Sequence, residues 1–276
     1  MNSRLKQVEK GQRFRELHER AGAFIIPNPW DIGTARLLAC LGFEALATTS
    51  MGYAFSTGHR DNTVDRDHVM NHVAEIAAAT ELPVSADLEN GFGDGPNVVV
   101  ETIKLAAAAG AVGGSIEDAT GRADDPIYDL EKAAERISAA AEAVRGLPFT
   151  FTLTARAENY LHGRPNLKDT IARLQAYQEA GADVLYAPGL ASEEDIASVV
   201  KSVDRPVNAV MGLKGVQLSL ASLGALGVKR VSVGSALART ALGAFLRAAH
   251  EMREQGTFTF AKQAASAAEI TAMFTD

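Results

Sequence analysis

The alternation of two kinds of segment along the chain is the feature that most constrains its fold. Short apolar runs rich in β-branched residues alternate with longer stretches rich in Ala and Leu, where apolar side chains recur at helical spacing. Strands that lack an apolar–polar alternation are typical of a parallel sheet, because helices cover both of its faces. We expect such strands at residues 24–27, 43–49, 84–87, 112–117, 149–156, 184–187, 207–211 and 230–233, with intervening helices that include residues 98–109, 130–144, 167–180 and 215–226.

Four glycines recur where an expected helix ends and the next strand begins, namely Gly42, Gly110, Gly181 and Gly227. A glycine just past a helix C-terminus adopts the left-handed conformation at little cost, so the recurrence marks repeated β/α units. About eight such units in 276 residues predict an α/β fold, a single parallel (β/α)8 barrel. A doubly wound open sheet is the alternative.

The segments outside the barrel are expected to be helical. No linker rich in Pro, Gly or Ser divides the chain, so residues 1–276 are predicted to form one domain. We expect an N-terminal helix within residues 1–22 that closes the bottom of the barrel, a barrel core at residues 23–240, and C-terminal helices within residues 241–276, one of them at residues 260–273. Phe258, Phe260 and Phe274 would be costly to expose, so this tail is expected to pack on something, such as a neighbouring subunit.

Charge and cysteine content exclude several kinds of partner. The formal net charge of −7 argues against nucleic acid or anionic lipid, and an anionic substrate would need local positive charge. The single cysteine, Cys40, allows no intrachain disulfide and fits a reducing cytoplasm. Residues 1–20 lack the apolar segment of a secretory signal, and no apolar run reaches the roughly 18 residues that a membrane span needs.

Acidic residues follow the strands expected second to fifth in the chain. Asp87 and Glu89 end the third strand, Glu117 ends the fourth, Glu158 follows the fifth, and Asp61 lies in the loop after the second. The carboxyl ends of barrel strands meet at one mouth, where such a barrel carries its active site. Clustered carboxylates raise one another's pKa unless a cation lies among them, and oxygen ligands alone suit Mg²⁺ or Mn²⁺.

The roles expected of these acids follow from the coordination habits of Mg²⁺. This ion keeps several waters and takes one or two direct carboxylates. We predict a metal site made of Asp87, Glu89 and Glu117, in which Asp87 is the direct ligand and Glu89, Glu117 and the nearby Asp61 hold the waters of the metal. For Asp61 and for Asp118, the alternative is a helix cap or a surface charge.

Several other residues at the mouth are candidates for substrate binding. Arg156 could bind a substrate carboxylate through its planar fork, or form a structural ion pair with Glu117 or Glu158; we favour both roles together. The backbone at Gly91 could approach a ligand. The segment Thr49, Ser50 and Met51, expected as a loop after the second strand, could bind a carboxylate through its hydroxyls and free backbone N–H groups. Candidate catalytic residues are Arg156, Glu117 and Asp61.

The cysteine and most of the histidines are expected to have no catalytic role. Cys40 is expected to lie inert in the core of an Ala/Leu-rich helix. Histidines in helical stretches are expected at the surface, whereas those in loops at the mouth keep a chance of contacting substrate. The first group is His18, His68, His72 and His250, and the second is His59 and His162.

These motifs together resemble the isocitrate lyase and phosphoenolpyruvate mutase superfamily over nearly the whole chain. The most specific segments are Asp87-Leu88-Glu89-Asn90-Gly91-Phe92-Gly93, Ile116-Glu117-Asp118, Ala155-Arg156-Ala157-Glu158 and Gly58-His59-Arg60-Asp61. The resemblance implies a Mg²⁺-dependent barrel, usually a homotetramer with its last helix swapped between partners. It implies that the metal chelates an oxo acid and stabilises its enolate, that Thr49, Ser50 and Met51 hold the substrate carboxylate, and that Arg156 holds the enolate or the far acid group.

The departures from the superfamily's patterns concern substrate choice. Isocitrate and methylisocitrate lyases carry a Lys/Arg-Cys-Gly-His loop after the fourth strand, but residues 119–128 contain no cysteine here and also lack the Lys- and Asn-bearing loop of phosphoenolpyruvate mutase. Ala187, Pro188 and Gly189 stand where phosphonate enzymes present a histidine, and Ala47 replaces their tryptophan. The favoured function is a lyase or decarboxylase of a small oxo acid or substituted malate. A phosphonopyruvate hydrolase or mutase, and a barrel that binds an oxo acid without turnover, remain open.

Overall fold

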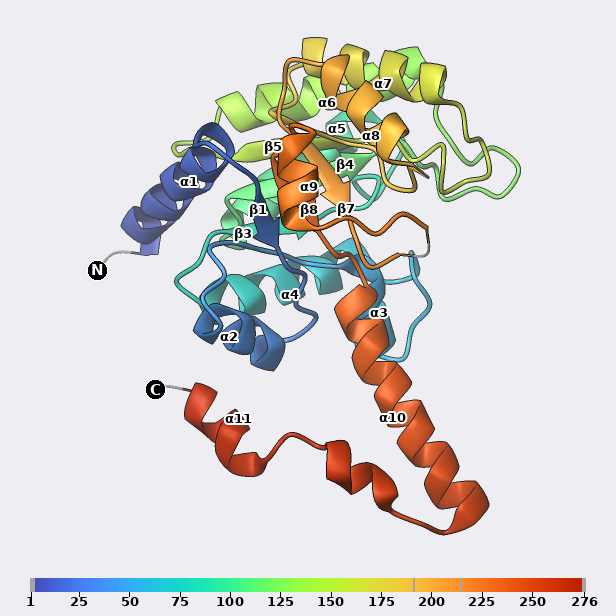
Figure 1. Ribbon diagram of the computed structural model, residues 1–276. Coiled ribbons are helices and arrows are strands. Elements are labelled where there is room, and N and C mark those ends of the chain that lie inside the picture. The colour runs from blue at the N-terminus through green and yellow to red at the C-terminus, as the bar shows by residue number, and fades with distance from the viewer. Residues whose placement is uncertain (1–2, 191, 214, 275–276) are drawn as a thin grey trace.

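The centre of the molecule is an eight-stranded parallel barrel surrounded by helices (Figure 1). The computed structural model describes residues 3–190, 192–213 and 215–274. The strands lie in the order β1, β8, β7, β6, β5, β4, β3, β2, and a hydrogen bond from the Ala47 N–H to the Pro27 carbonyl oxygen (3.1 Å) bridges the gap beside β2. The barrel prediction is confirmed, and the doubly wound sheet is excluded. The strands are β1 (Phe24–Ile26), β2 (Leu46–Ala47), β3 (Val84–Asp87), β4 (Gly113–Glu117), β5 (Thr152–Arg156), β6 (Val184–Tyr186), β7 (Val207–Val210) and β8 (Arg230–Ser232).

The helices follow the strands in the expected alternation. Most begin at a side-chain cap, as at Asp31, where the carboxylate accepts from the Thr34 N–H (2.7 Å). The helices are α1 (Ser3–Glu19), α2 (Ile32–Cys40), α3 (Ser50–Ser56), α4 (Arg66–Ala78), α5 (Pro96–Ala108), α6 (Leu130–Arg145), α7 (Leu167–Glu179), α8 (Glu193–Lys201), α9 (Leu220–Ala225), α10 (Ala236–Gln255), the 3₁₀ turn η1 (Thr259–Gln263) and α11 (Ala267–Met273).

The four glycines expected at helix–strand junctions all adopt the left-handed conformation. Their φ angles are 85° at Gly42, 99° at Gly110, 104° at Gly181 and 92° at Gly227. Each lies one residue past the C-cap of α2, α5, α7 or α9, as the repeated β/α units predict.

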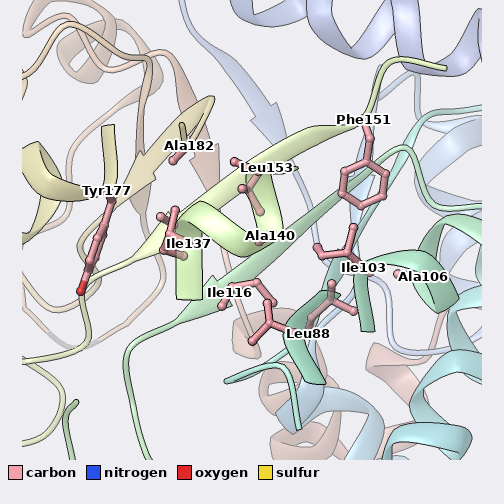
Figure 2. Close-up of a cluster of buried hydrophobic side chains, with 14 of the residues drawn as sticks. Leu88, Ile103, Ala106, Ile116, Ile137, Ala140, Phe151, Leu153, Tyr177 and Ala182 are labelled. Carbon is pink, nitrogen blue, oxygen red and sulfur yellow. The ribbon is translucent and has the colours of Figure 1, made fainter. Parts of the chain in front are cut away.

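The largest hydrophobic cluster lies between the barrel wall and the helices that cover it (Figure 2). Leu88, Ile116 and Leu153 contribute from the strand side, and Ile103 and Ile137 from α5 and α6, all 3% exposed or less. Their burial leaves the opposite faces of the same strands to line the barrel interior. The helices thereby fix the strand ends from which the site is built.

Helix α1 closes the bottom of the barrel, as expected. Its Phe14 is fully buried, and a Cβ atom placed on Gly113 of β4 would lie only 2.7 Å from the Phe14 ring. His18 of the same helix is buried between the Phe14 and Phe24 rings. The expectation that His18 lies at the surface is therefore wrong, because it is on the barrel-facing side of α1.

Two other side chains point in directions that the sequence did not reveal. His72 of α4 is buried and stacks on Tyr53 of α3 with ring centroids 3.9 Å apart, so its predicted surface position is also wrong. Cys40, expected in the core, is exposed at the end of α2. His68 and His250 are exposed, as expected.

Two expected helices are shorter than predicted. The helix expected at residues 215–226 is reduced to α9, because Gly215 has a φ of +119° and Ser219 caps the helix only at Leu220. The helix expected at residues 260–273 is divided into η1 and α11, since Ala264 and Ser266 are extended. Figure 1 shows α10 projecting away from the barrel body, whereas α11 turns back and contacts α2. Phe258, between these helices, remains 67% exposed.

The contact between α1 and β4 generates a stability prediction. Gly113→Ala should lower the free energy of unfolding by ~1–3 kcal/mol, because the added methyl group meets Phe14 and the Thr152 carbonyl oxygen, 3.0 Å away. Urea denaturation measures the change. Gly33→Ala in α2, where the nearest atom lies 3.5 Å from the new Cβ, is the matched control and should not destabilise. Equal stability of both variants would contradict the close packing of α1.

Candidate active site

A cavity of about 310 Å³ opens among the carboxyl ends of the strands. β3 and β4 contribute Asp87 and Glu117, and β5 contributes Arg156 to the same lining. Asp61 comes from the loop between α3 and α4, and Glu158 from just beyond β5. Residues from four segments of the chain thus meet at one mouth, which is where a β/α barrel places its reactive groups.

Arg156 is the centre of this cluster, because all three of its guanidinium nitrogens bind carboxylates. Nη1 lies 2.9 Å from Asp87, Nη2 lies 3.0 Å from Glu117, and Nε lies 2.8 Å from Glu158. The expected ion pairs with Glu117 and Glu158 are therefore present, and Asp87 is a third. Burial raises the pKa of both glutamates above the ordinary value. One guanidinium does not balance three buried carboxylates.

Glu89 adds to this excess of negative charge. Burial, then Asp87 and Asp61, raise the pKa of its carboxyl to about 8. It lines an adjoining groove that shares Glu117 with the main cavity. Its φ of +48° is a left-handed conformation that a glutamate adopts at a cost, so the fold holds this acid in place against backbone strain.

Asp61 carries a buried carboxylate oxygen with no hydrogen-bond partner, Oδ1. Burial and the nearby Asp87 raise its pKa, while a hydrogen bond from the Ser50 side chain opposes that rise. An unpartnered buried carboxylate oxygen is costly, and a cation or its bound water would satisfy it.

The donor set fits a hard divalent cation. The clustered side chains offer only oxygen atoms, and they carry a negative excess around a single arginine. Within the described part of the chain, no three His, Cys, Asp or Glu side chains already lie close enough together to form a complete metal-binding site. Mg²⁺ takes one or two carboxylates directly and reaches others through water, so it does not need three side chains that already converge. The predicted ligand roles of Asp87, Glu89 and Glu117 stay predictions.

The segment after β2 forms the first turn of α3 rather than a loop. The Thr49 hydroxyl accepts from the Gly52 N–H as the helix cap, and the Ser50 N–H donates to Asp87 Oδ2 (3.1 Å). The N–H of Ser50 is therefore not free, contrary to the expectation for this segment. Thr49, Ser50 and Met51 all line the cavity, so their proposed contact with a substrate carboxylate stays a prediction.

Gly91 packs against helix α5 and does not face the cavity. Its φ is +80°, and an added Cβ would lie 3.0 Å from Val99 of α5. Its carbonyl oxygen accepts from the Thr102 hydroxyl (2.9 Å). The structure does not place Gly91 in the lining of the cavity, so its expected contact with substrate gains no support.

Asp118 also has a structural role. Its buried carboxylate accepts from the Glu158 N–H (2.7 Å), from Arg173 (3.0 Å) and from the Tyr177 hydroxyl (2.6 Å). Because neighbouring strand residues point to opposite faces, Asp118 faces the helices while Glu117 faces the cavity. Asp118 thereby fixes the backbone that carries Glu158.

The loop that follows β4 is held against the barrel rim. Ala119 and Ile127 pair as an antiparallel bridge, and the Tyr128 hydroxyl donates to Asp94 (2.5 Å). Arg136 of α6 donates to the carbonyl oxygens of Asn90, Gly93 and Asp94, which secures the loop after β3.

Of the two loop histidines, His162 borders the cavity, whereas His59 is exposed and absent from the lining residues.

Three inward-facing residues escaped the sequence analysis, namely Tyr186, Asn208 and Arg230. They line the cavity below the carboxylates, on β6, β7 and β8. Attention to strand ends alone overlooked Asn208 and Arg230, which lie nearer the starts of their strands. The sequence signal that could have indicated them is a polar or charged residue inside an otherwise apolar strand.

The chain matches a family of known proteins over most of its length. The family model described as phosphoenolpyruvate phosphomutase matches residues 14–253. The chain belongs to the phosphoenolpyruvate mutase and isocitrate lyase superfamily. A solved structure from Burkholderia cenocepacia J2315, named only provisionally as a lyase/mutase, is 66% identical with a TM-score of 0.96, over 98% of this chain and 97% of that one. An uncharacterised Mycobacterium tuberculosis H37Rv protein is 33% identical over 80% of this chain and 81% of its own length. The resemblance drawn from the motifs is confirmed.

Members of this superfamily with named reactions are more distant. A 2-methylisocitrate lyase of Halalkalibacterium halodurans is 29% identical over 74% of this chain and 68% of its own. An oxaloacetate decarboxylase of Pseudomonas putida GB-1 is 27% identical over 71% and 68%, respectively. A phosphonopyruvate hydrolase solved with oxalate and Mg²⁺ has a TM-score of 0.84 and 25% identity, over 96% of this chain and 94% of that one. The relatives are thus lyases, decarboxylases and a hydrolase.

Among the described residues, no helix has the length and apolarity required to cross a membrane.

The charge cluster generates a prediction about metal affinity. Asp87→Ala should weaken Mg²⁺ or Mn²⁺ binding at least about tenfold, because it removes the predicted direct ligand. Isothermal titration calorimetry with each metal ion measures the loss. Asp204→Ala removes one exposed carboxylate from the segment before β7, outside both the cavity and the adjoining groove, and should bind metal like the wild type. Unchanged affinity in Asp87→Ala would reject the assignment.

Proposed function

We propose that this protein is a Mg²⁺- or Mn²⁺-dependent carbon–carbon lyase or decarboxylase that acts on a small oxo acid or a substituted malate. The observation that carries the proposal is the buried excess of carboxylates around Arg156, with an unpartnered oxygen on Asp61. Such a cluster is costly unless a cation binds there. The relatives named as oxaloacetate decarboxylase and 2-methylisocitrate lyase support a reaction of this class.

In this proposal Asp87 would hold the metal directly, with Glu89, Glu117 and Asp61 holding its waters. When bound, the metal supplies Lewis-acid polarisation of the substrate's carboxylate and oxo oxygens and stabilises the enolate. Arg156 orients Asp87 and Glu117 through its two Nη atoms, and its charge lies where negative charge develops on the substrate. Thr49, Ser50 and Met51 orient the substrate carboxylate from the first turn of α3.

A panel of substrates tests the proposal against its alternatives. Product release should be measured for oxo acids, substituted malates and phosphonates, with and without Mg²⁺. Metal-dependent pyruvate release from an oxo acid or a malate supports the proposal. Turnover of phosphonopyruvate alone would instead support a phosphonate hydrolase or mutase, the reading favoured by the phosphonopyruvate hydrolase neighbour. Metal-dependent binding of oxalate without any turnover would indicate a binding protein.

The contacts of Arg156 predict a kinetic effect. Arg156→Lys keeps the charge but loses the planar fork, so kcat/KM on the best substrate should fall at least about tenfold. Steady-state kinetics at saturating Mg²⁺ measures the fall. Arg20→Lys is the matched control, because the Arg20 guanidinium forks onto Glu44 at the surface, away from the cavity; it should leave kcat/KM unchanged. Unaltered kinetics in Arg156→Lys would leave Arg156 with a purely structural role.

The absence of a cysteine at the mouth predicts what the enzyme does not cleave. A lyase acting on isocitrate or methylisocitrate must manage a proton on the departing succinate carbon, and a thiolate suits that task because its pKa is readily tuned. Cys40 lies on α2 and does not line the cavity, and burial raises the pKa of Tyr128 to about 12. We expect turnover of a smaller oxo acid but no appreciable cleavage of either tricarboxylate.

Assays of the purified protein with Mg²⁺ at neutral pH decide this prediction. Decarboxylation of a β-carboxy oxo acid needs no such thiol, so the smaller substrate serves as the internal control. Cleavage of isocitrate or methylisocitrate at roughly 1 s⁻¹ or faster, an ordinary enzymatic rate, would overturn it.

We also propose that the protein works in the cytoplasm as a homo-oligomer, a tetramer by analogy with the superfamily. The projecting tail supports the assembly, because Phe245 of α10 and Phe258 beyond it are 66% and 67% exposed. Apolar surface of this kind is costly in water and would be covered by a partner. Neither nucleic acid nor a membrane is proposed as a partner.

A further inference from the structure

The cavity extends below the carboxylate cluster into a part of the barrel that is lined by small and polar residues. Large branched aliphatic side chains usually fill a barrel interior. Here Ala47 and Ser85 face each other across β2 and β3, two residues before Asp87, and both line the cavity. Ala47 is only partly buried although it lies inside the barrel, because one side of it borders the cavity.

The guanidinium of Arg230 lies in the lower part of this space. Glu117, Arg156, Tyr186, Asn208 and Arg230 are Cα partners from β4 to β8, one after another in the registers of adjacent strands. All five line the cavity, so this row of polar side chains passes around the barrel wall from the cluster to Arg230. Arg230 is 5% exposed, and that exposed part faces the cavity.

The partners of Arg230 are all neutral. Its Nε donates to Asn208 (2.8 Å) and its Nη2 to the Thr154 hydroxyl (3.0 Å), while Nη1 lies 3.5 Å from His18 Nε2. Burial lowers the pKa of His18 to about 3, so this imidazole is neutral. No carboxylate of a described residue lies within 4.0 Å of Arg230. A guanidinium has five N–H donors, so two are left for a ligand.

The two arginines of the cavity therefore differ in what they can bind. Arg156 has a carboxylate on each of its three nitrogens, so its charge is already paired within the protein. Arg230 pairs only with neutral groups, and no carboxylate of the described residues neutralises its charge. A buried charge of this kind is costly unless an anion pairs with it.

We propose that Arg230 binds a second carboxylate of the substrate, so that the substrate class is a dicarboxylic oxo or hydroxy acid. This rests on the proposed function: one end of the acid chelates at the cluster, and the other reaches past Ala47 to Arg230. A monocarboxylic acid fills only the upper half of the cavity. Arg230 is thus a specificity-determining residue.

Two ligands with the same chelating end test the assignment. Lactate and malate are both 2-hydroxy acids, and malate adds only the terminal carboxylate. By isothermal titration calorimetry with Mg²⁺, the wild type should bind malate at least about tenfold more tightly than lactate, since a charge-assisted pair is gained. Arg230→Gln should reduce this ratio to about one by weakening malate alone.

A second variant keeps the test valid if Arg230→Gln fails to fold. Ala47→Leu leaves Arg230 intact but fills the space above it, so it should also abolish the preference for malate while lactate binding remains. Arg205→Gln, which removes an exposed arginine just before β7, is the charge-matched control and should keep the wild-type ratio.

The possible failures are distinguishable. The assignment is overturned if the wild type does not bind malate or binds it no more tightly than lactate. It is also overturned if the malate-to-lactate ratio is unchanged in Arg230→Gln or in Ala47→Leu. In either case Arg230 only connects Asn208, Thr154 and His18. Oxalate, which represents the chelating end alone, tests the proposed function separately. Oxalate binding that needs no Mg²⁺, or no oxalate binding, rejects that function, whereas Mg²⁺-dependent oxalate binding with a malate-to-lactate ratio near one rejects only the role of Arg230.

Discussion

The ion pairs of Arg156 with Asp87, Glu117 and Glu158 are the interaction on which the rest of the site depends. Removing either partner of a buried pair leaves an uncompensated charge, so each of these groups constrains the others. The guanidinium brings the ends of β3, β4 and β5 into one charge system. The negative excess that remains, with Glu89 and Asp61, is the electrostatic basis for a bound cation.

Residues that never reach the cavity hold this charge system in position. Asp118 accepts from the Glu158 N–H through Oδ1 and from Arg173 and Tyr177 through Oδ2. Arg136 binds three carbonyl oxygens of the loop after β3, which stabilises the strained backbone around Glu89. The helix layer therefore does more than cover the barrel: its polar side chains fix the backbone to which the reactive acids are attached.

The fold could be predicted from the sequence because its signals are local, whereas the orientation of side chains could not. Gly42, Gly110, Gly181 and Gly227 mark helix ends through their own backbone preference, without reference to the rest of the chain. The acids at strand ends were likewise predictable, since topology alone brings them together. His18, His72 and Cys40 were misplaced because the rotation of α1, α4 and α2 about their axes depends on packing. Arg230 and Asn208 were missed because strands buried on both faces show no alternation that separates the barrel interior from its outer face.

The two arginines of the cavity show how the same side chain acquires different roles from its strand neighbours. Around Arg156, adjacent strands supply carboxylates, and the guanidinium organises acids that face a cation. Around Arg230, they supply an amide and a hydroxyl, from Asn208 and Thr154, and the charge is left for something outside the protein. A barrel interior of aliphatic side chains would be less costly than this polar one, because a desolvated cation without a counter-charge opposes folding. Departures of this kind from ordinary packing are concentrated at functional sites, so the lower half of the cavity is best understood as part of the binding site rather than of the core.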